Sequence, residues 1–271
     1  MSATERAVIG VCVKWLAGQP QVVGSPNDTR YAGFSASDQA ALELALRRAE
    51  LQHAYVRVVA VAPAAARPQL VALAACGANQ LAHIECTGPM ASVDVAESMS
   101  KYLRDCTTIW CGDYSLDRGS GSVPAFLAAL LGVPQALGVV EIDPTASTLE
   151  PVRRLDAGRR EVLRLSEPGV ISVEGSLATL RRASLSATLS PAVDLVTDTA
   201  TPTHGVVVGD MRPYRPRPRE AAPPEGATAL ERIRSTTAAG SAHTRGEIAE
   251  VSTDEAVTRV VNALREWGYL P

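Results

Sequence analysis

Runs of apolar residues alternate with segments of helical spacing through the first half of the chain. The apolar runs are short and nearly continuous, which is typical of strands that are buried on both faces of a parallel sheet. Residues 38–51 show the helical spacing best, because Ala41, Leu42, Ala45 and Leu46 fall on one face. The predicted strands are residues 7–13, 56–61, 81–86 and 108–111, and the predicted helices are residues 38–51, 68–76, 93–104 and 123–131. This order predicts a three-layer, Rossmann-like α/β fold.

The pattern changes after Gln135, where strand-like segments follow one another without helices between them. These segments are residues 136–142, 149–155, 161–165 and 169–173, and residues 206–208 are a further candidate. A turn at residues 156–159 joins two of them at hairpin spacing. We therefore expect a mostly parallel sheet with one antiparallel hairpin at its edge.

A loop rich in glycine and serine, residues 112–124, joins a predicted strand to a predicted helix. Backbone N–H groups at the start of a helix have no intrahelical partner, and the helix dipole adds partial positive charge there, so such a loop can bind a phosphate. Gly119 and Gly121 let the backbone approach a ligand, and Asp117 offers a carboxylate to a sugar hydroxyl. An ordinary flexible connection is the alternative interpretation. The spacing fits neither the P-loop nor the dinucleotide-binding motif, so a P-loop NTPase is not expected.

The C-terminal part of the chain differs in composition from the rest. Residues 211–226 are rich in proline and arginine, which excludes a helix or a central strand. A capping box at residues 252–255 then begins a predicted amphipathic helix at residues 256–267. A disordered linker is one interpretation, but the capped helix beyond it favours an extended arm that lies on a partner protein. We expect a nucleotide-binding domain at residues 1–200 and a C-terminal arm at residues 201–271.

Composition narrows the class of protein. Hydrophobic residues make up 46% of the 271 residues and charged residues 20%, which predicts a sizeable buried core. The net charge of −3 argues against general nucleic-acid binding. No apolar run reaches the length of a membrane span, and the first residues do not resemble a signal peptide, so we expect a cytoplasmic protein. The five cysteines show no metal-binding spacing, so we expect small buried thiols and no metal.

Six segments, in this order along the chain, resemble the beta subunit of electron-transfer flavoproteins. They are residues 11–14, 35–43, 73–78, 112–135, 155–158 and 181–185, and the resemblance runs over nearly the whole length. It implies a sheet of the adenine nucleotide alpha hydrolase type, an AMP bound by this chain, and an FAD held mostly by a larger alpha subunit. It also implies an electron carrier subunit that passes electrons from a dehydrogenase to a downstream acceptor. The residues show no nucleophile–base pair that would require a stand-alone enzyme.

By the same resemblance, the AMP pocket takes its residues from four segments of the chain. They are Cys12, Ser35, Ala36, Ser37, Asp38, Val61, Gly112, Asp117, Gly119, Ser120, Gly121, Ser122 and Val123. These positions follow successive predicted parallel strands, and open α/β sheets bind ligands at the carboxyl ends of their strands. We expect the phosphate near residues 121–123 and the ribose or base near residues 35–38 and Asp117.

Residues 181–192 resemble the family's recognition loop, whose leucine enters a pocket on the client dehydrogenase. Leu185 matches that leucine, and Arg181 and Arg182 are expected to contact the partner as well. An exposed apolar anchor in a polar loop suits a transient interface, because it combines one buried contact with fast release. A leucine of the core is the alternative interpretation.

The chain departs from the family pattern at several positions. Trp15 stands where a Val-Pro-Asp segment is common, Ser35 and Ala36 replace an Asn-Pro pair, and no lysines follow Leu185. These departures indicate a divergent bacterial branch, and a link to the peptide-derived redox cofactor mycofactocin is one hypothesis. Two other functions stay open. One is a bifurcating subunit that binds a second FAD in place of AMP and oxidises NADH, and the other is a stand-alone adenine-nucleotide-binding protein of the universal-stress type.

Overall fold

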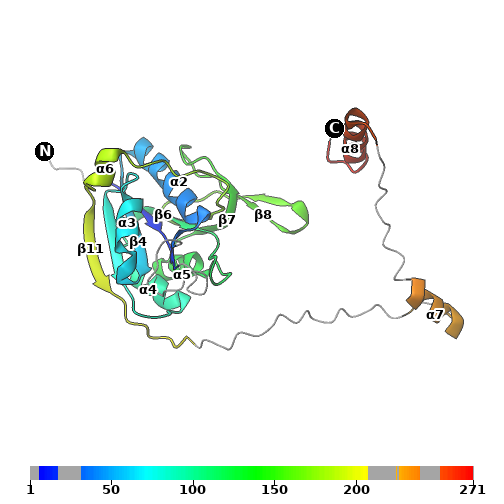
Figure 1. Cartoon of the computed structure of the whole chain (residues 1–271), viewed down its shortest axis with the longest axis horizontal. Coiled ribbons are helices and arrows are strands. Elements are labelled where there is room, and N and C mark those ends of the chain that lie inside the picture. Colours follow the sequence, from blue (N-terminus) through cyan, green and yellow to red (C-terminus); the bar gives the residue numbers. More distant parts are fainter. Residues whose placement is uncertain (1–5, 18–31, 207–223, 225, 239–250, 271) are drawn as a thin grey trace. The chain divides into compact units, whose positions relative to one another are not determined.

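A computed structural model of the chain describes residues 6–17, 32–206, 224, 226–238 and 251–270. The chain divides into two compact units, Met1–Gly209 and Asp210–Pro271, and each is described by itself (Figure 1). The first unit contains the sheet. The second contains helix α7 (Ala229–Ala238) and helix α8 (Thr253–Glu266), the latter capped by Ser252, whose hydroxyl accepts from the amide of Glu255.

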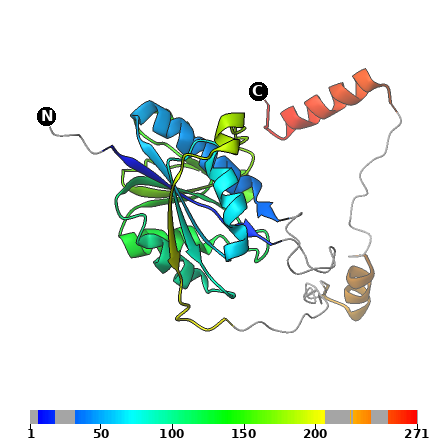
Figure 2. The same cartoon turned by 60° about the vertical axis from the view of Figure 1, so that its left-hand side comes forward.

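A nine-stranded sheet forms the centre of the first unit, and its strands fan out in Figure 2. Its order is β11-β5-β4-β1-β6-β10-β7-β8-β9. The seven strands from β11 to β7 are parallel, and β8 and β9 add an antiparallel hairpin beside β7. The strands are β1 (Val8–Cys12), β4 (Tyr55–Ala62), β5 (Gln80–Glu85), β6 (Cys106–Gly112), β7 (Gln135–Glu141), β8 (Val152–Arg154), β9 (Arg160–Val162), β10 (Gly169–Val173) and β11 (Asp194–Thr199). The predicted mostly parallel sheet with an edge hairpin is therefore confirmed.

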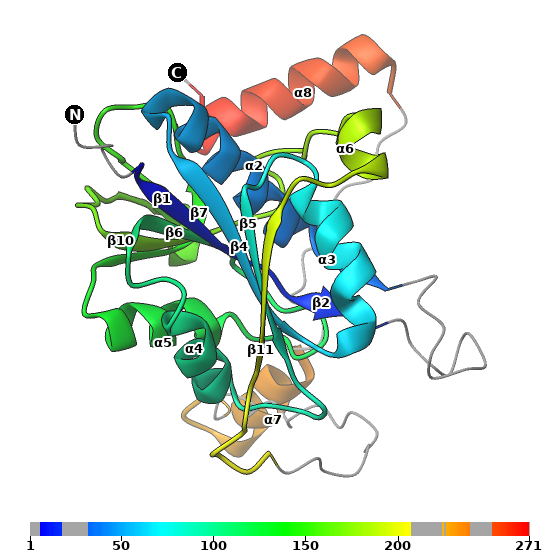
Figure 3. The same cartoon turned by 90° about the vertical axis from the view of Figure 1, so that its left-hand side faces the viewer.

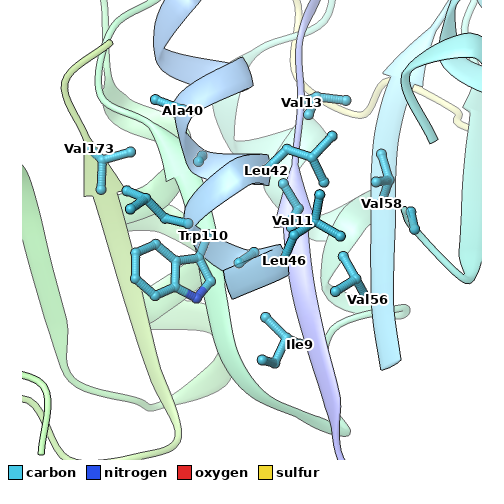
Figure 4. Packing of buried hydrophobic residues seen from close by; sticks show 14 of the residues in the cluster. Ile9, Val11, Val13, Ala40, Leu42, Leu46, Val56, Val58, Trp110 and Val173 are labelled. Atoms are coloured by element: carbon cyan, nitrogen blue, oxygen red, sulfur yellow. The ribbon is translucent and has the colours of Figure 1, made fainter. Parts of the chain in front are cut away.

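Helices cover both faces of the sheet, which makes three layers (Figure 3). Helices α2 (Ala36–Gln52) and α3 (Arg67–Ala74) lie on one face, and α4 (Ser92–Ser100) and α5 (Ser122–Leu131) lie on the other. The side chains of β1 alternate between two cores: Ile9 and Val11 pack toward α2, while Cys12 belongs to the core under α4 and α5. Figure 4 shows the first core, in which the fully buried Trp110 of β6 is the largest side chain. Burial of strand side chains on both faces explains why these strands are apolar at successive positions.

Three strands and one helix of the first unit were not predicted from the sequence. Strand β11 is an exposed edge strand with an acidic residue near each end, so it lacks the apolar run that marks the central strands. Helix α6 (Leu185–Leu189) forms one turn inside the predicted recognition loop. Strands β2 (Trp15–Leu16) and β3 (Gly33–Phe34) form a short antiparallel pair, and each strand has two residues.

Two sequence predictions fall wholly or mainly outside the described residues. Residues 211–226 are almost entirely outside them, so the extended arm stays a prediction. Of the candidate strand at 206–208, only Val206 is described, and it is not part of a strand. Among the described helices, none combines the length and the apolar character that a membrane span requires.

Hydrogen bonds from Thr203 and His204 to Asp94 hold the chain beyond β11 against helix α4, and we call these three residues the clasp. The buried carboxylate of Asp94 accepts hydrogen bonds from the Thr203 hydroxyl (2.6 Å), the His204 amide (3.0 Å) and His204 Nδ1 (2.7 Å). The hydrogen bond and the negative charge of Asp94 raise the pKa of His204 above its usual value of 6.5. Hydrogen bonds from Thr203 and His204 in turn lower the pKa of Asp94.

We expect His204→Ala to lower the melting temperature more at pH 6 than at pH 9. The folded-state pKa of His204 is raised, so its stabilising contribution is complete below the unfolded pKa and is lost as the pH rises through the folded value. Thermal unfolding of both proteins across this pH range measures the difference. Thr203→Val is the matched control, because it removes a neutral donor to the same carboxylate and should act equally at both pH values. An equal loss for His204→Ala at pH 6 and pH 9 would contradict the clasp.

Candidate functional site: a cavity at the carboxyl ends of the parallel strands

A cavity of about 400 Å³ opens at the carboxyl ends of β1, β4, β5 and β6. The chain runs from β1 to β4 on one side of the sheet centre, whereas β6 pairs with β1 on the other side. The strand order therefore reverses between β1 and β6. Doubly wound sheets bind ligands in the crevice outside this point, because the following loops part there.

Nine of the thirteen residues predicted for the AMP pocket line this cavity. They are Cys12, Asp38, Val61, Gly112, Asp117, Ser120, Gly121, Ser122 and Val123. The other four, Ser35, Ala36, Ser37 and Gly119, lie beside the cavity but do not line it. The fold thus gathers positions that are more than a hundred residues apart in the chain.

Helix α5 presents its N-terminus to the cavity. Ser122 and Val123, the first two residues of the helix, both line it, and the N-cap residue Gly121 has no side chain that could accept from their amides. The amides at these positions lack intrahelical acceptors by the geometry of the helix. Amides in this position can bind an anion, and the helix dipole strengthens such binding.

The loop between β6 and α5 is held in a fixed shape by hydrogen bonds. The amide of Ser115 donates to Ser120 O (2.8 Å), and the amide of Gly119 donates to Ser115 O (2.8 Å). Gly119 adopts a φ of +65°, so its role is in the turn and not at the cavity wall. Arg118 donates to Met90 O (2.6 Å) and joins this loop to the loop after β5.

Lys14 connects the end of β1 to the same loop. Its ammonium group donates to Ser115 Oγ (2.8 Å) and forms an ion pair with Asp117. Burial acts to raise the pKa of Asp117, but the hydrogen bonds from Lys14 and Ser115 outweigh it and leave this pKa below its usual value. Asp117 therefore stays charged and already has a partner, so a ribose hydroxyl would share it with Lys14.

Helix α2 brings a buried carboxylate to the cavity. Ser35 caps the helix by accepting from the Asp38 amide (3.0 Å), and its hydroxyl donates to Asp38 Oδ2 (2.8 Å). The amide of Lys14 also donates to Asp38 Oδ2 (3.4 Å). Burial raises the pKa of Asp38 to about 6, against the opposing effect of these hydrogen bonds. A carboxylate that is costly to ionise here is suited to accept from a ligand hydroxyl or amine.

Several residues that line the cavity were not predicted from the sequence. Lys14 and Trp15 follow β1, and the segment 86–90 follows β5. The rule that ligands bind at strand ends could have pointed to residues 86–90, because they follow a predicted strand. They are mostly small or apolar, so their residue types gave no chemical signal.

The five cysteines are free thiols, and three of them line the cavity. Cys12, Cys106 and Cys111 are buried as expected, whereas Cys76 and Cys86 are half-buried, so the prediction of uniformly buried thiols was wrong for these two. The neighbouring Cys111 and burial raise the pKa of Cys12 well above its usual value. Cys86 is the accessible thiol of the cavity, and Cys76 lies elsewhere.

The predicted recognition loop projects from the α2 and α3 side of the unit. Leu185 and Leu189 lie one turn apart on helix α6 and are each 75% exposed, so Leu185 is not a core residue. Arg181 anchors the loop, because its guanidinium group binds both carboxylate oxygens of Glu43 (2.9 and 3.1 Å) and also pairs with Glu50. Arg182 is exposed. Arg181 therefore holds the loop against α2, whereas Arg182 is exposed on the loop surface.

A comparison with models of known protein families identifies the family of the chain. The family model described as the electron transfer flavoprotein domain matches residues 27–201, more than half of the chain. The matched region contains α5, the loop before it and helix α6. No curated protein matches the sequence.

We expect Asp38→Asn to stabilise the ligand-free protein at pH 8 by on the order of 2–3 kcal/mol, since one pKa unit corresponds to about 1.4 kcal/mol. The raised pKa means that the favourable contribution of protonated Asp38 is complete below the unfolded pKa of 3.8 and is lost as the pH rises through about 6. The gain from Asn should therefore shrink between pH 6 and pH 4. Denaturant unfolding at a series of pH values measures it.

Asp117→Asn is the control in the same cavity, and it should behave in the opposite sense. The pKa of Asp117 is lowered, so its substitution should destabilise the protein at pH 8 and lose this effect at low pH. If Asp38→Asn destabilised the protein at pH 8, ionised Asp38 would not carry the free-energy cost of burial that its raised pKa implies.

Proposed function

Because the chain belongs to the electron transfer flavoprotein domain family, we propose that it is the beta-type subunit of a heterodimeric electron-transfer flavoprotein. In this role it binds AMP in the cavity at the strand ends and pairs with a larger alpha subunit that holds most of an FAD. It passes electrons from a client dehydrogenase to a downstream acceptor, with Leu185 at the contact to the client.

The start of α5 at the cavity wall is the observation that carries this proposal. The amides of Ser122 and Val123 suit a phosphate, and the uncapped helix leaves them available to it. Trp15, Val61 and Met90 supply apolar wall for a base, and Asp38 supplies an acceptor. The residues present thus fit a nucleoside monophosphate.

The volume of the cavity favours AMP over a second FAD. About 400 Å³ lies near the small end of the range of about 300–1,000 Å³ that is typical of ligand pockets. A mononucleotide fits this volume better than a dinucleotide with a second ring system. The bifurcating alternative therefore has less support, and the proposal assigns the flavin of the family to the second subunit.

The flavin supplies the redox chemistry when it is bound, and the described residues position partners around it. AMP in this chain would have a structural role, because it would join the loops after β1, β5 and β6. The fixed loop at residues 113–121 and the anchored loop at Arg181 keep the two binding surfaces in place. The link to mycofactocin stays a hypothesis that no described residue tests.

We expect AMP to protect Cys86 from alkylation by a maleimide by about tenfold or more and to leave Cys76 unchanged. Cys86 lines the cavity and Cys76 does not, although both are half-buried, so Cys76 is an internal control within the same molecule. Mass spectrometry of the labelled peptides measures the rate at each thiol. Stronger protection by FAD than by AMP, with two flavins for each heterodimer, would favour the bifurcating subunit instead.

Ser122→Pro tests the phosphate site directly. Proline is favourable at the first position of a helix and removes one N–H, so the helix should persist while AMP binds about tenfold more weakly. Adenosine, which has no phosphate, should protect Cys86 equally in both proteins. Equal binding of AMP and adenosine by the wild type would contradict a phosphate at the start of α5.

We expect Leu185→Ala to leave the melting temperature and the flavin content of the heterodimer unchanged and to slow its reduction by the client dehydrogenase at least tenfold. Leu185 is exposed and supports no core, whereas removal of a central apolar anchor weakens a transient interface strongly. Stopped-flow absorbance of the flavin measures the reduction. Leu51→Ala, at an exposed position on α2, is the control, and the flavin of this variant should be reduced at the wild-type rate. Wild-type kinetics in Leu185→Ala would remove the anchor assignment.

A further inference from the structure

Two cationic side chains line the cavity at the strand ends, and their charges are met differently. The ammonium group of Lys14 forms an ion pair with Asp117, so this charge is neutralised within the cavity wall. The guanidinium group of Arg118 donates from Nη1 to the neutral carbonyl of Met90 (2.6 Å), and no carboxylate among the described residues forms an ion pair with it. Arg118 is therefore the cation of this wall whose charge is left for a ligand.

The charge of Arg118 is not explained by its structural contact. Elsewhere in the first unit, Arg48 pairs with Glu167 (2.6 Å) and Arg57 pairs with Asp105 (2.6 Å), so each of these arginines meets a carboxylate. The link from Arg118 to the loop after β5 uses one N–H group and a neutral acceptor, and a neutral amide side chain could make it as well. The other N–H groups of Arg118 and its positive charge thus have no structural task among the described residues.

Arg118 lies in a turn that hydrogen bonds close just before helix α5. The amide of Gly119 donates to Ser115 O (2.8 Å), and the amide of Ser115 donates to Ser120 O (2.8 Å). Helix α5 begins at Ser122, and both Arg118 and Ser122 line the cavity. The guanidinium group and the amides at the start of the helix therefore border the same space from one short segment of the chain.

A phosphate group suits this combination of donors. A guanidinium group presents its N–H donors in a planar fork that matches phosphate oxygens, and it is more weakly hydrated than an ammonium group. A phosphate monoester carries three acceptor oxygens and a charge of about −1.5 to −2 near pH 7. It can therefore accept from the helix amides and from Arg118 together, whereas a nucleoside has no anionic group to offer them.

We propose that Arg118 contacts the phosphate of the bound nucleotide and makes the cavity selective for a phosphorylated ligand over the free nucleoside. This inference rests on the proposed function, which assigns AMP to this cavity. It adds the side chain that carries the selectivity and the ligand chemistry that this side chain recognises, a phosphate dianion. The contact with Met90 gives Arg118 a second effect, because the same side chain joins the loop after β5 to the bound phosphate.

The test measures the binding of AMP and of adenosine to the full chain by isothermal titration calorimetry. Arg118→Gln should weaken the binding of AMP about tenfold or more and leave that of adenosine unchanged, because it removes the charge while glutamine can still donate to Met90 O. Arg118→Lys should bind AMP with intermediate affinity, because it keeps the charge and loses the planar fork. Arg118 is exposed, so both variants should melt at the wild-type temperature.

Arg104→Gln is the matched control, since Arg104 is exposed and does not line the cavity. It should bind both ligands as the wild type does. Equal losses of AMP and adenosine affinity in Arg118→Gln would reduce Arg118 to a link between two loops, and wild-type AMP affinity in that variant would exclude the phosphate contact. Either result would overturn this inference and leave the proposed function standing.

A different result would separate the two proposals in the opposite direction. If the wild-type chain bound FAD and not AMP, the proposed AMP site would be wrong. A loss of FAD affinity of about tenfold in Arg118→Gln would still support the contact between Arg118 and a phosphate. A wild-type chain that bound neither nucleotide would overturn both proposals.

Discussion

The close approach of backbone segments at two glycines is the constraint on which the site depends. A Cβ at Gly112 would lie 2.7 Å from the side-chain atoms Asp38 Oδ1 and Ser37 Oγ and 3.0 Å from the amide nitrogen of Asp38, so glycine lets the first turn of α2 pack closely against the end of β6. A Cβ at Gly121 would lie 2.0 Å from Asp113 O, so glycine also lets the loop before α5 close on its own start. These two contacts bring a carboxylate from α2 and the amides of α5 to one cavity.

The charges around the cavity balance one another in a way that suits a small anion. Lys14 neutralises Asp117, and the ionisation of Asp38 is opposed by burial. Attraction for a phosphate would come from the helix terminus and from the guanidinium group of Arg118, which also lines the cavity and donates to the neutral carbonyl of Met90.

The sequence by itself determined the central strands, because burial on both faces demands successive apolar residues, and it located the loop before α5, because clustered glycine and serine mark the connection from a strand to a helix. It missed β11 and α6, since exposed edge elements carry no periodic apolar signal. Only the tertiary structure decided that Asp38 faces the cavity while Ser37 does not, and that Asp117 is already paired with Lys14. Residues so far apart in the chain meet through the order of the strands, and no local pattern of side chains records that order.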